Sequence, residues 1–142
     1  MAVMSRTTQY ALYALQYLHR SGSKQYVLAR SISEHEAVPS NYLSKVMRTL
    51  VRAGILASAR GPSGGFRLAR PLETVMLLEV RELFEGPWTE RACVLGLGRC
   101  DGDAPCAAHH NWQPVASTIE NYLATTSVAD IVAEAKAVAP AA

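Results

Sequence analysis

The residues best suited to chemistry are the three cysteines of the chain and two of its four histidines, which all lie within residues 91–112. Cys93, Cys100 and Cys106 come first, and His109 and His110 follow at once. Thiolates are soft ligands for zinc and iron-sulfur clusters, and imidazole also binds these metals. An odd number of closely spaced thiols does not fit a disulfide framework, so the segment predicts metal binding, redox sensing or catalysis.

Three thiols leave one ligand position to fill, because iron-sulfur clusters and structural zinc sites usually take four protein ligands. A helix that begins at Pro105 would place Cys106 and His109 on one face, with His110 as the competing ligand. Asp101 and Asp103 would oppose free thiolates, whereas a metal deprotonates its thiol ligands. The local charge therefore favours a metal site over a catalytic cysteine. A cluster, a zinc ion, a metal-free thiol sensor and inert cysteines all remain open at this point.

Length and composition limit what the rest of the chain can be. With 142 residues, 49% of them hydrophobic, the chain predicts one domain, or one domain with a small appendage, around a modest core. No apolar run approaches the ~20 residues that cross a bilayer, and the N-terminal stretch lacks the apolar centre of a signal peptide. We therefore expect a cytoplasmic protein without a membrane partner.

The net charge of +2 hides a strong division between the two halves of the chain. Through Arg70 there are ten Lys and Arg residues against two acids, whereas four basic residues face ten acids afterwards. Such segregation indicates that the first half faces a polyanion and the second half does something else.

The basic half predicts a helix-turn-helix. Apolar spacing predicts helices over residues 5–20, with Ser5, Thr7 or Thr8 as cap, and 27–34, with Leu28 and Ile32 inward. A third helix runs from Pro39 to a stop at Gly54, and its polar face contains no acid. This is the pattern of a recognition helix in the major groove. The residues expected to contact DNA from this helix are Ser40, Asn41, Tyr42, Lys45 and Arg48.

A β-hairpin is predicted next, with strands over residues 55–59 and 66–69 and a Gly-rich loop between them. A hairpin after a helix-turn-helix, with arginines beside its tip, indicates a wing that contacts the DNA backbone or minor groove. A plain structural hairpin is the alternative. The wing residues expected at the DNA are Arg60, Ser63, Gly64 and Gly65.

The second half predicts helices over residues 74–85, about 105–125 and about 128–137. The long helix has more apolar surface, from Trp112 to Leu123, than a small domain would cover, so we expect it to pack against a second copy, since helix-turn-helix proteins commonly pair to read two half-sites of double-stranded DNA. The expected fold class is mainly α with a small β-hairpin. The expected division is a winged helix-turn-helix domain over residues 1–72 and a sensor and dimerisation region over 73–142, with the cysteine loop at 91–107.

The sequence resembles the Rrf-two family of bacterial winged-helix transcriptional regulators (IscR-, NsrR- and RirA-like proteins) over nearly its whole length. The resemblance rests on "YALYAL", "YLSKVMRTLVRAGIL", the wing "RGPSGGFRLAR" and the three-cysteine loop C-x6-C-x5-C, in this order. It implies a homodimeric transcription factor that binds a palindromic operator in double-stranded DNA, and many members hold an iron-sulfur cluster on three cysteines. These correspond here to Cys93, Cys100 and Cys106.

The resemblance also implies a fourth ligand. In IscR-like members it is the histidine three residues after the last cysteine, a position that His109 matches. NsrR-like members use an N-terminal acid instead, but this chain has Gln9 there and no acid before Glu34. IscR-like ligation favours [2Fe-2S], with [4Fe-4S] as the alternative. We therefore expect a DNA-binding regulator, not an enzyme, that senses redox state, iron or nitric oxide through this cluster. A thiol-based or zinc-stabilised regulator is the competing hypothesis.

Overall fold

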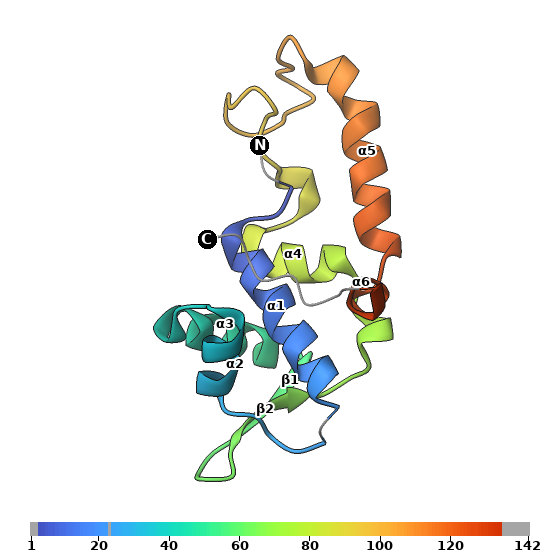
Figure 1. Cartoon of the computed structure of the whole chain (residues 1–142). Helices are drawn as coiled ribbons and strands as arrows, with labels where there is room; N and C mark the ends of the chain where they lie inside the picture. Colours follow the sequence, from blue (N-terminus) through green and yellow to red (C-terminus); the bar gives the residue numbers. More distant parts are fainter. Residues whose placement is uncertain (1–2, 23, 135–142) are drawn as a thin grey trace.

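The computed structural model describes residues 3–22 and 24–134, which form a mainly helical protein with one two-stranded antiparallel sheet. Figure 1 shows α5 rising away from the other helices, with the cysteine segment at its far end and the hairpin at the opposite end of the molecule. The predicted fold class is confirmed. In chain order the elements are α1 Arg6–Ser21, α2 Ala29–Glu36, α3 Ser40–Arg52, β1 Leu56–Ala59, β2 Gly65–Leu68, η1 Leu72–Thr74, α4 Leu77–Glu85, η2 Trp88–Glu90, α5 His109–Thr125 and α6 Val128–Glu134.

The core of the N-terminal half lies between α1 and α3. Ser5 caps α1 by accepting a hydrogen bond from the Thr8 backbone N–H at 3.2 Å, which satisfies one free donor of the first turn. The predicted apolar stripe of α3 is fully buried against α1 and α2 and consists of Leu43, Val46, Met47 and Leu50. Burying this stripe forces the polar side of α3 outward, where DNA can reach it.

The prediction for α2 was wrong at its first residue. Ile32 is buried as expected, but Leu28 is 50% exposed. The helix begins at Ala29, two residues later than predicted, and Leu28 has extended backbone angles as the residue before it. Leu28 therefore lies outside the helical spacing that would have turned its side chain inward.

The hairpin pairs Leu56 with Leu68 and Ala59 with Gly65, so the first strand ends at Ala59 as predicted and the other three strand limits differ by one residue. The strand β2 also bridges back to the segment before α2, through Val27 and Phe66. Gly65 has φ of +128°, and a Cβ there would lie 2.2 Å from the Val27 carbonyl oxygen. Only glycine fits at this close approach of two backbones.

The fourth helix starts at Leu77 and not at residue 74. Val75 and Met76 are extended because their backbone pairs with residues 126–128, where α5 joins α6: Leu77 N–H donates to the Thr126 carbonyl and Val128 N–H donates to the Val75 carbonyl, at 3.0 and 2.8 Å. These hydrogen bonds compete with helix formation and connect α4 to α6.

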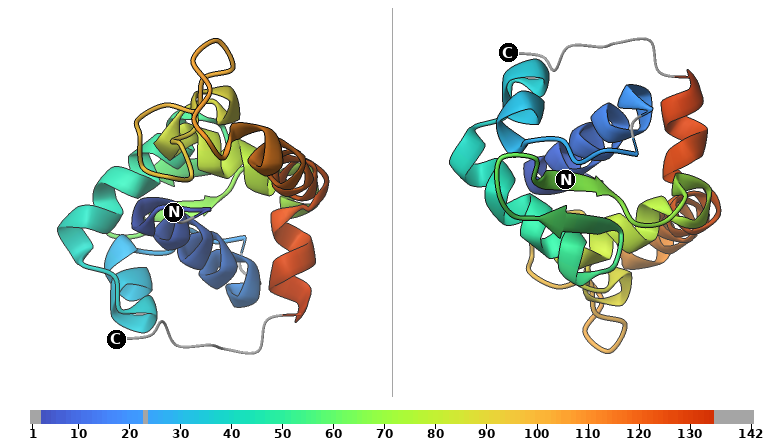
Figure 2. Two further views of the ribbon diagram at one scale, coloured as in Figure 1. Left: turned by 90° about the horizontal axis from the view of Figure 1, so that it is seen from above. Right: turned by 90° about the horizontal axis from the view of Figure 1, so that it is seen from below.

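The long helix begins at His109, four residues after the predicted start at Pro105. Of the short helix predicted over 128–137, α6 accounts for Val128–Glu134, and the remainder lies outside the described residues. The two views in Figure 2 place α6 on the side of α1 opposite to α2 and α3. Among the described residues, none of the helices has the length and apolar character to cross a membrane.

Candidate functional site

The cysteine segment folds into a compact loop ahead of α5. Ala92 and Arg99 form an isolated bridge, and Cys100 N–H donates to the Arg91 carbonyl at 2.9 Å. Gly96 and Gly98 have φ of +73° and +88°, which lets the chain reverse between the first two cysteines. This turn brings Cys93 and Cys100 to one side of the loop.

All four predicted ligands line one cavity of about 170 Å³ at the start of α5. The other lining residues are Leu97, Arg99, Asp101 and Ala104. Cys93 and His109 are buried, at 5% and 7% exposure, and Cys100 and Cys106 are half-buried. The described cysteines are free thiols. The structure therefore brings together the donor set that the sequence predicted.

The four donors are arranged as two pairs. The Sγ atoms of Cys93 and Cys106 lie 3.4 Å apart, and Cys100 Sγ lies 3.7 Å from His109 Nδ1. In the described part of the chain, no three His, Cys, Asp or Glu side chains converge closely enough to hold a single metal ion. The arrangement thus offers two adjacent two-ligand positions and not one tetrahedral position.

The backbone around Cys93 favours its thiolate. The N–H groups of Leu97 and Leu95 donate to Cys93 Sγ and lower the pKa of this thiol, against the opposing effect of burial. A thiolate is the form that binds a metal or attacks a disulfide.

The prediction that Cys106 and His109 share one helix was wrong, although His109 lies at the cavity as expected. Cys106 precedes α5 and is not part of it, and the His109 backbone N–H donates to the Cys106 carbonyl at 3.1 Å. His109 turns its Nδ1 toward the cavity, whereas His110 is exposed and contacts His109 edge to face.

Two residues beside the cavity were not predicted from the sequence. Gln113 Nε2 lies 3.1 Å from His109 Nε2, and Gln113 Oε1 accepts a hydrogen bond from Arg91 Nη2 at 3.2 Å. Gln113 could have been found, because it is four residues after His109 on the same helix. Arg91 gives no such signal, since only the folded loop brings it to α5.

The second candidate site is the polar face of α3 with the wing. The five α3 residues expected at DNA, Ser40, Asn41, Tyr42, Lys45 and Arg48, are all exposed. In the wing, Arg60 and Ser63 are exposed and Gly65 is half-buried, but Gly64 is buried. A Cβ on Gly64 would lie 2.3 Å from the Ala59 carbonyl oxygen, so this glycine shapes the turn.

A basic cavity of about 480 Å³ separates α3 from the wing. Arg48 and Arg52 line it from α3, and Arg60 lines it from the wing. Three guanidinium groups around one open cavity suit a DNA phosphate, because arginine donates in the planar fork that phosphate accepts.

Tyr42 is exposed, but its side chain also contacts the first helix. Its hydroxyl lies 2.5 Å from the Thr7 hydroxyl, and its ring packs edge to face on Tyr10 at 5.6 Å between centroids. The start of the predicted recognition helix is therefore held by α1, a contact that the sequence did not reveal.

A basic helix-turn-helix followed by a wing defines a winged-helix DNA-binding protein. Comparison with known proteins gives its family. Residues 4–134 match the Rrf2 family model, described as an iron-dependent transcriptional regulator. A protein of Aquifex aeolicus named as an HTH-type transcriptional regulator is 32% identical over 132 residues, covering 92% of this chain and 91% of the relative. The transcriptional regulator IscR of Vibrio vulnificus is 28% identical, covering 89% of this chain and 74% of IscR.

Solved structures show the same fold. CymR, the global cysteine regulator of B. subtilis, superposes with a TM-score of 0.78 at 20% identity, and the superposition covers 96% of this chain and 100% of CymR. T. potens IscR superposes with a TM-score of 0.73 at 23% identity, covering 95% of this chain and 89% of that one. The chain belongs to the Rrf2 (Rrf-two) family of transcriptional regulators.

Proposed function

We propose that this transcriptional regulator controls its DNA affinity through a [2Fe-2S] cluster held by Cys93, Cys100, Cys106 and His109. The observation that carries the proposal is the grouping of three thiols and one imidazole around a single cavity as two pairs. When bound, such a cluster supplies a one-electron redox centre that is also lost or altered when iron is scarce or oxidants are present.

The pairing favours this cluster over the other metal sites. A [2Fe-2S] cluster takes two protein ligands at each of its two irons, which matches Cys93 with Cys106 and Cys100 with His109. A structural zinc ion needs all four donors around one point, and a [4Fe-4S] cluster takes one ligand at each of four irons. Neither requirement matches two separate pairs. The match of residues 4–134 to a family described as an iron-dependent transcriptional regulator supports an iron-linked role.

The chain's own residues prepare the site for thiolate ligands. Backbone N–H groups of Leu95 and Leu97 donate to Cys93 Sγ, and they would stabilise the sulfur's negative charge in the ligated state as well. The low exposure of Cys93 and His109 limits access of water to one member of each pair.

The output of the regulator is binding to a palindromic DNA operator by a homodimer. Arg48 and Arg60 would contact phosphate, and the polar face of α3 would enter the major groove. The cysteine loop joins η2 to α5, so loading of the site biases the orientation of α5 relative to the winged domain. A cluster acts in this way only if it favours one of two arrangements of the dimer.

Anaerobic reconstitution with iron and sulfide tests the proposal. We expect a visible absorption spectrum of a [2Fe-2S] cluster, two irons and two sulfides per chain, and different DNA affinity for the loaded and metal-free proteins. Cys93→Ser should lose the cluster while leaving metal-free DNA binding intact. Absence of cluster absorption, or equal DNA affinity in both states, would refute the proposal.

A thiol switch is the second candidate, and the contact between Cys93 and Cys106 favours it. Their Sγ atoms are 3.4 Å apart and the Cys93 pKa is lowered, so hydrogen peroxide could oxidise Cys93 to a sulfenic acid that Cys106 then converts to a disulfide, releasing water. Peptide mass spectrometry without reductant would detect this bond after peroxide treatment of metal-free protein. Retention of both free thiols would exclude the switch.

A further inference from the structure

Both ring nitrogens of His109 contact other polar side chains. The proposed function does not account for the contact on the side of the ring that faces away from the thiols. Nδ1 faces Cys100, at 3.7 Å from its Sγ. Nε2 lies 3.1 Å from the side-chain nitrogen of Gln113, one turn further along α5.

Arg91 fixes which end of the Gln113 amide faces the histidine. A guanidinium group only donates hydrogen bonds, and Arg91 Nη2 donates to Gln113 Oε1 at 3.2 Å. The amide nitrogen of Gln113 is therefore left for His109. Because that nitrogen only donates, His109 Nε2 must accept, and the single proton of the neutral ring lies on Nδ1, toward the Cys100 sulfur.

This tautomer cannot bind a metal through Nδ1. A ligating ring nitrogen uses its lone pair, so the proton must move to Nε2, and the resulting N–H needs an acceptor. Gln113 supplies an acceptor only if its amide turns over. The turned amide would direct its NH₂ group at Arg91, where donor meets donor and the hydrogen bond is lost.

We propose that Gln113 is a positioning residue that makes ligation by His109 and attachment of Arg91 to α5 mutually exclusive. In the metal-free protein Gln113 holds Arg91 and keeps His109 in the tautomer that cannot ligate. Loading of the site turns the Gln113 amide toward His109 and releases Arg91. This inference rests on the proposed function, because it concerns the ligand that completes the same site.

Arg91 is well placed to transmit its release to the rest of the fold. Its guanidinium carbon lies 5.5 Å from the centre of the Trp88 ring, and its Nη1 donates to the Trp88 carbonyl at 3.3 Å. The guanidinium carbon of the buried Arg81 also lies over Trp88, 4.6 Å from the centre of the ring. Two cations therefore contact one indole ring, and movement of Arg91 changes the electrostatic surroundings of Arg81.

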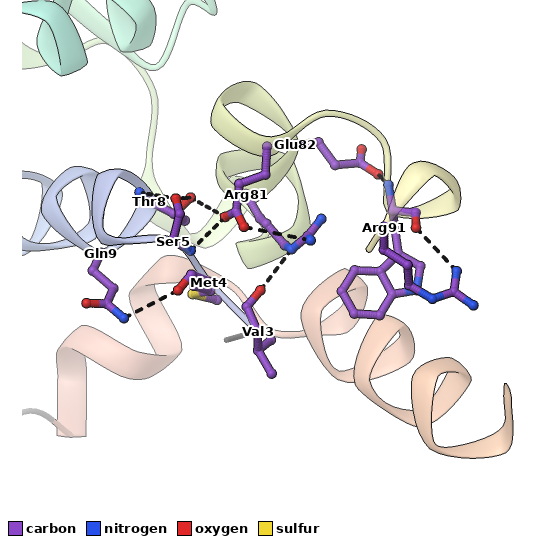
Figure 3. A network of polar contacts seen from close by, with 10 residues as sticks. Val3, Met4, Ser5, Thr8, Gln9, Arg81, Glu82 and Arg91 are labelled. Carbon is purple, nitrogen blue, oxygen red and sulfur yellow. Dashed lines mark hydrogen bonds and ion pairs between the residues drawn. The ribbon is translucent and has the colours of Figure 1, made fainter. Parts of the chain in front are cut away.

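Arg81 in turn belongs to the polar network at the start of α1. Figure 3 shows Arg81 beside Val3 and close to the residues around Ser5 and Thr8. Arg81 Nε donates to the Val3 carbonyl at 2.9 Å, and Arg81 Nη2 lies 3.8 Å from the Glu85 carboxylate. A continuous series of contacts thus runs from Gln113 through Arg91, Trp88 and Arg81 to the helix that packs on α3.

The tautomer of His109 in the metal-free, full-length protein tests the first step directly. Long-range ¹H–¹⁵N NMR at about pH 8.5, where an ordinary histidine is neutral, distinguishes the two ring nitrogens. We expect the proton on Nδ1 in the wild type. Gln113→Glu should move it to Nε2, because a carboxylate accepts from Arg91 and from His109 at once. Ser117→Ala, an exposed change one turn further along α5, should leave the tautomer unchanged.

Cluster retention after reconstitution tests the second step. Gln113→Glu should slow the loss of the cluster to a chelator by several-fold, whereas Gln113→Leu should hasten it by roughly tenfold, the size of effect typical for a partner of a metal-bound histidine. A proton on Nε2 in the metal-free wild type, or equal retention in all variants, would overturn the inference. A wild-type protein that takes up no iron would instead refute the proposed function, and the NMR result would still show whether Gln113 sets the ring.

Discussion

The Thr8 hydroxyl donates to Glu85 Oε2 at 2.5 Å, and this contact joins α1 to the last residue of α4 across 77 positions of sequence. Thr8 is fully buried, and the same carboxylate accepts from the Ser5 backbone N–H at 3.1 Å. Arg81, also buried, lies beside Glu85. One carboxylate therefore satisfies two donors of the DNA-binding half and faces one buried cation.

Glu85→Ala should lower the free energy of unfolding by about 2–4 kcal/mol, because it removes the carboxylate that faces the buried Arg81 cation and accepts the Thr8 hydrogen bond. Urea denaturation followed by circular dichroism measures this change. Glu73→Ala, an exposed change in η1, is the matched control and should stay within about 0.5 kcal/mol. A similar small effect for Glu85→Ala would mean that the network contributes nothing to stability.

The helix-turn-helix could be predicted from the sequence because its signals are local. The stripe from Leu43 to Leu50 has helical spacing, and the glycines of the wing mark a turn whatever the rest of the fold does. The errors at Leu28 and at residue 74 share a cause. In both cases the backbone just before the helix pairs with a distant part of the chain, through Val27 with Phe66 and Met76 with Ser127, and residue spacing carries no record of such contacts.

In the candidate site, too, local features could be predicted and contacts between distant residues could not. The grouping of the three thiols and His109 around one cavity could be expected from their closeness in the sequence, whereas the choice of His109 over His110 as fourth donor rests on the resemblance to IscR-like proteins. The arrangement into two pairs was not predictable, since it depends on how the loop turns at Gly96 and Gly98. Two further contacts join elements far apart in the sequence, that of Arg91 with Gln113 and that of Thr7 with Tyr42. No pattern in a single sequence predicts such contacts.

Arg48→Ala and Arg60→Ala should each weaken DNA binding and reduce the salt dependence of log K by roughly one unit, as expected for the loss of one phosphate contact. Both arginines line the basic cavity between α3 and the wing. Fluorescence anisotropy with a duplex of mixed sequence, over a series of salt concentrations, provides the measurement. Arg48→Lys and Arg60→Lys keep the charge and should retain the slope. An unchanged slope in an alanine variant would place that arginine outside the interface.

Val115→Glu combined with Tyr122→Glu should yield a monomer, because these two α5 residues expose apolar side chains at 47% and 53% and lie two turns apart on one face. Sedimentation equilibrium of the wild type and the variant checks this. Ser117→Glu adds charge on the opposite side of the same helix and should leave the dimer intact. A wild type that sediments as a monomer would contradict the prediction outright.

Separate replacement of His109 and His110 should identify the fourth ligand. His109 is 7% exposed and turns Nδ1 into the thiol cavity, whereas His110 is exposed. After anaerobic reconstitution, His109→Ala should change the visible absorption and circular dichroism spectra and shorten the lifetime of the cluster. His110→Ala preserves the helix and serves as the matched control, and its spectrum should equal that of the wild type.

His109→Cys provides the decisive form of this experiment, because it restores a fourth ligand of a different kind. Four thiolates place more negative charge on a [2Fe-2S] cluster than three thiolates and a neutral imidazole, so the variant should retain the cluster and lower its reduction potential. Potentiometric titration followed by absorption measures that shift. A potential equal to that of the wild type would show that residue 109 does not touch the cluster, and the same shift in His110→Cys would transfer the ligand role to His110. A lowered potential confined to residue 109 would identify His109 as the ligand, since a loss of packing alone cannot be repaired by a thiol.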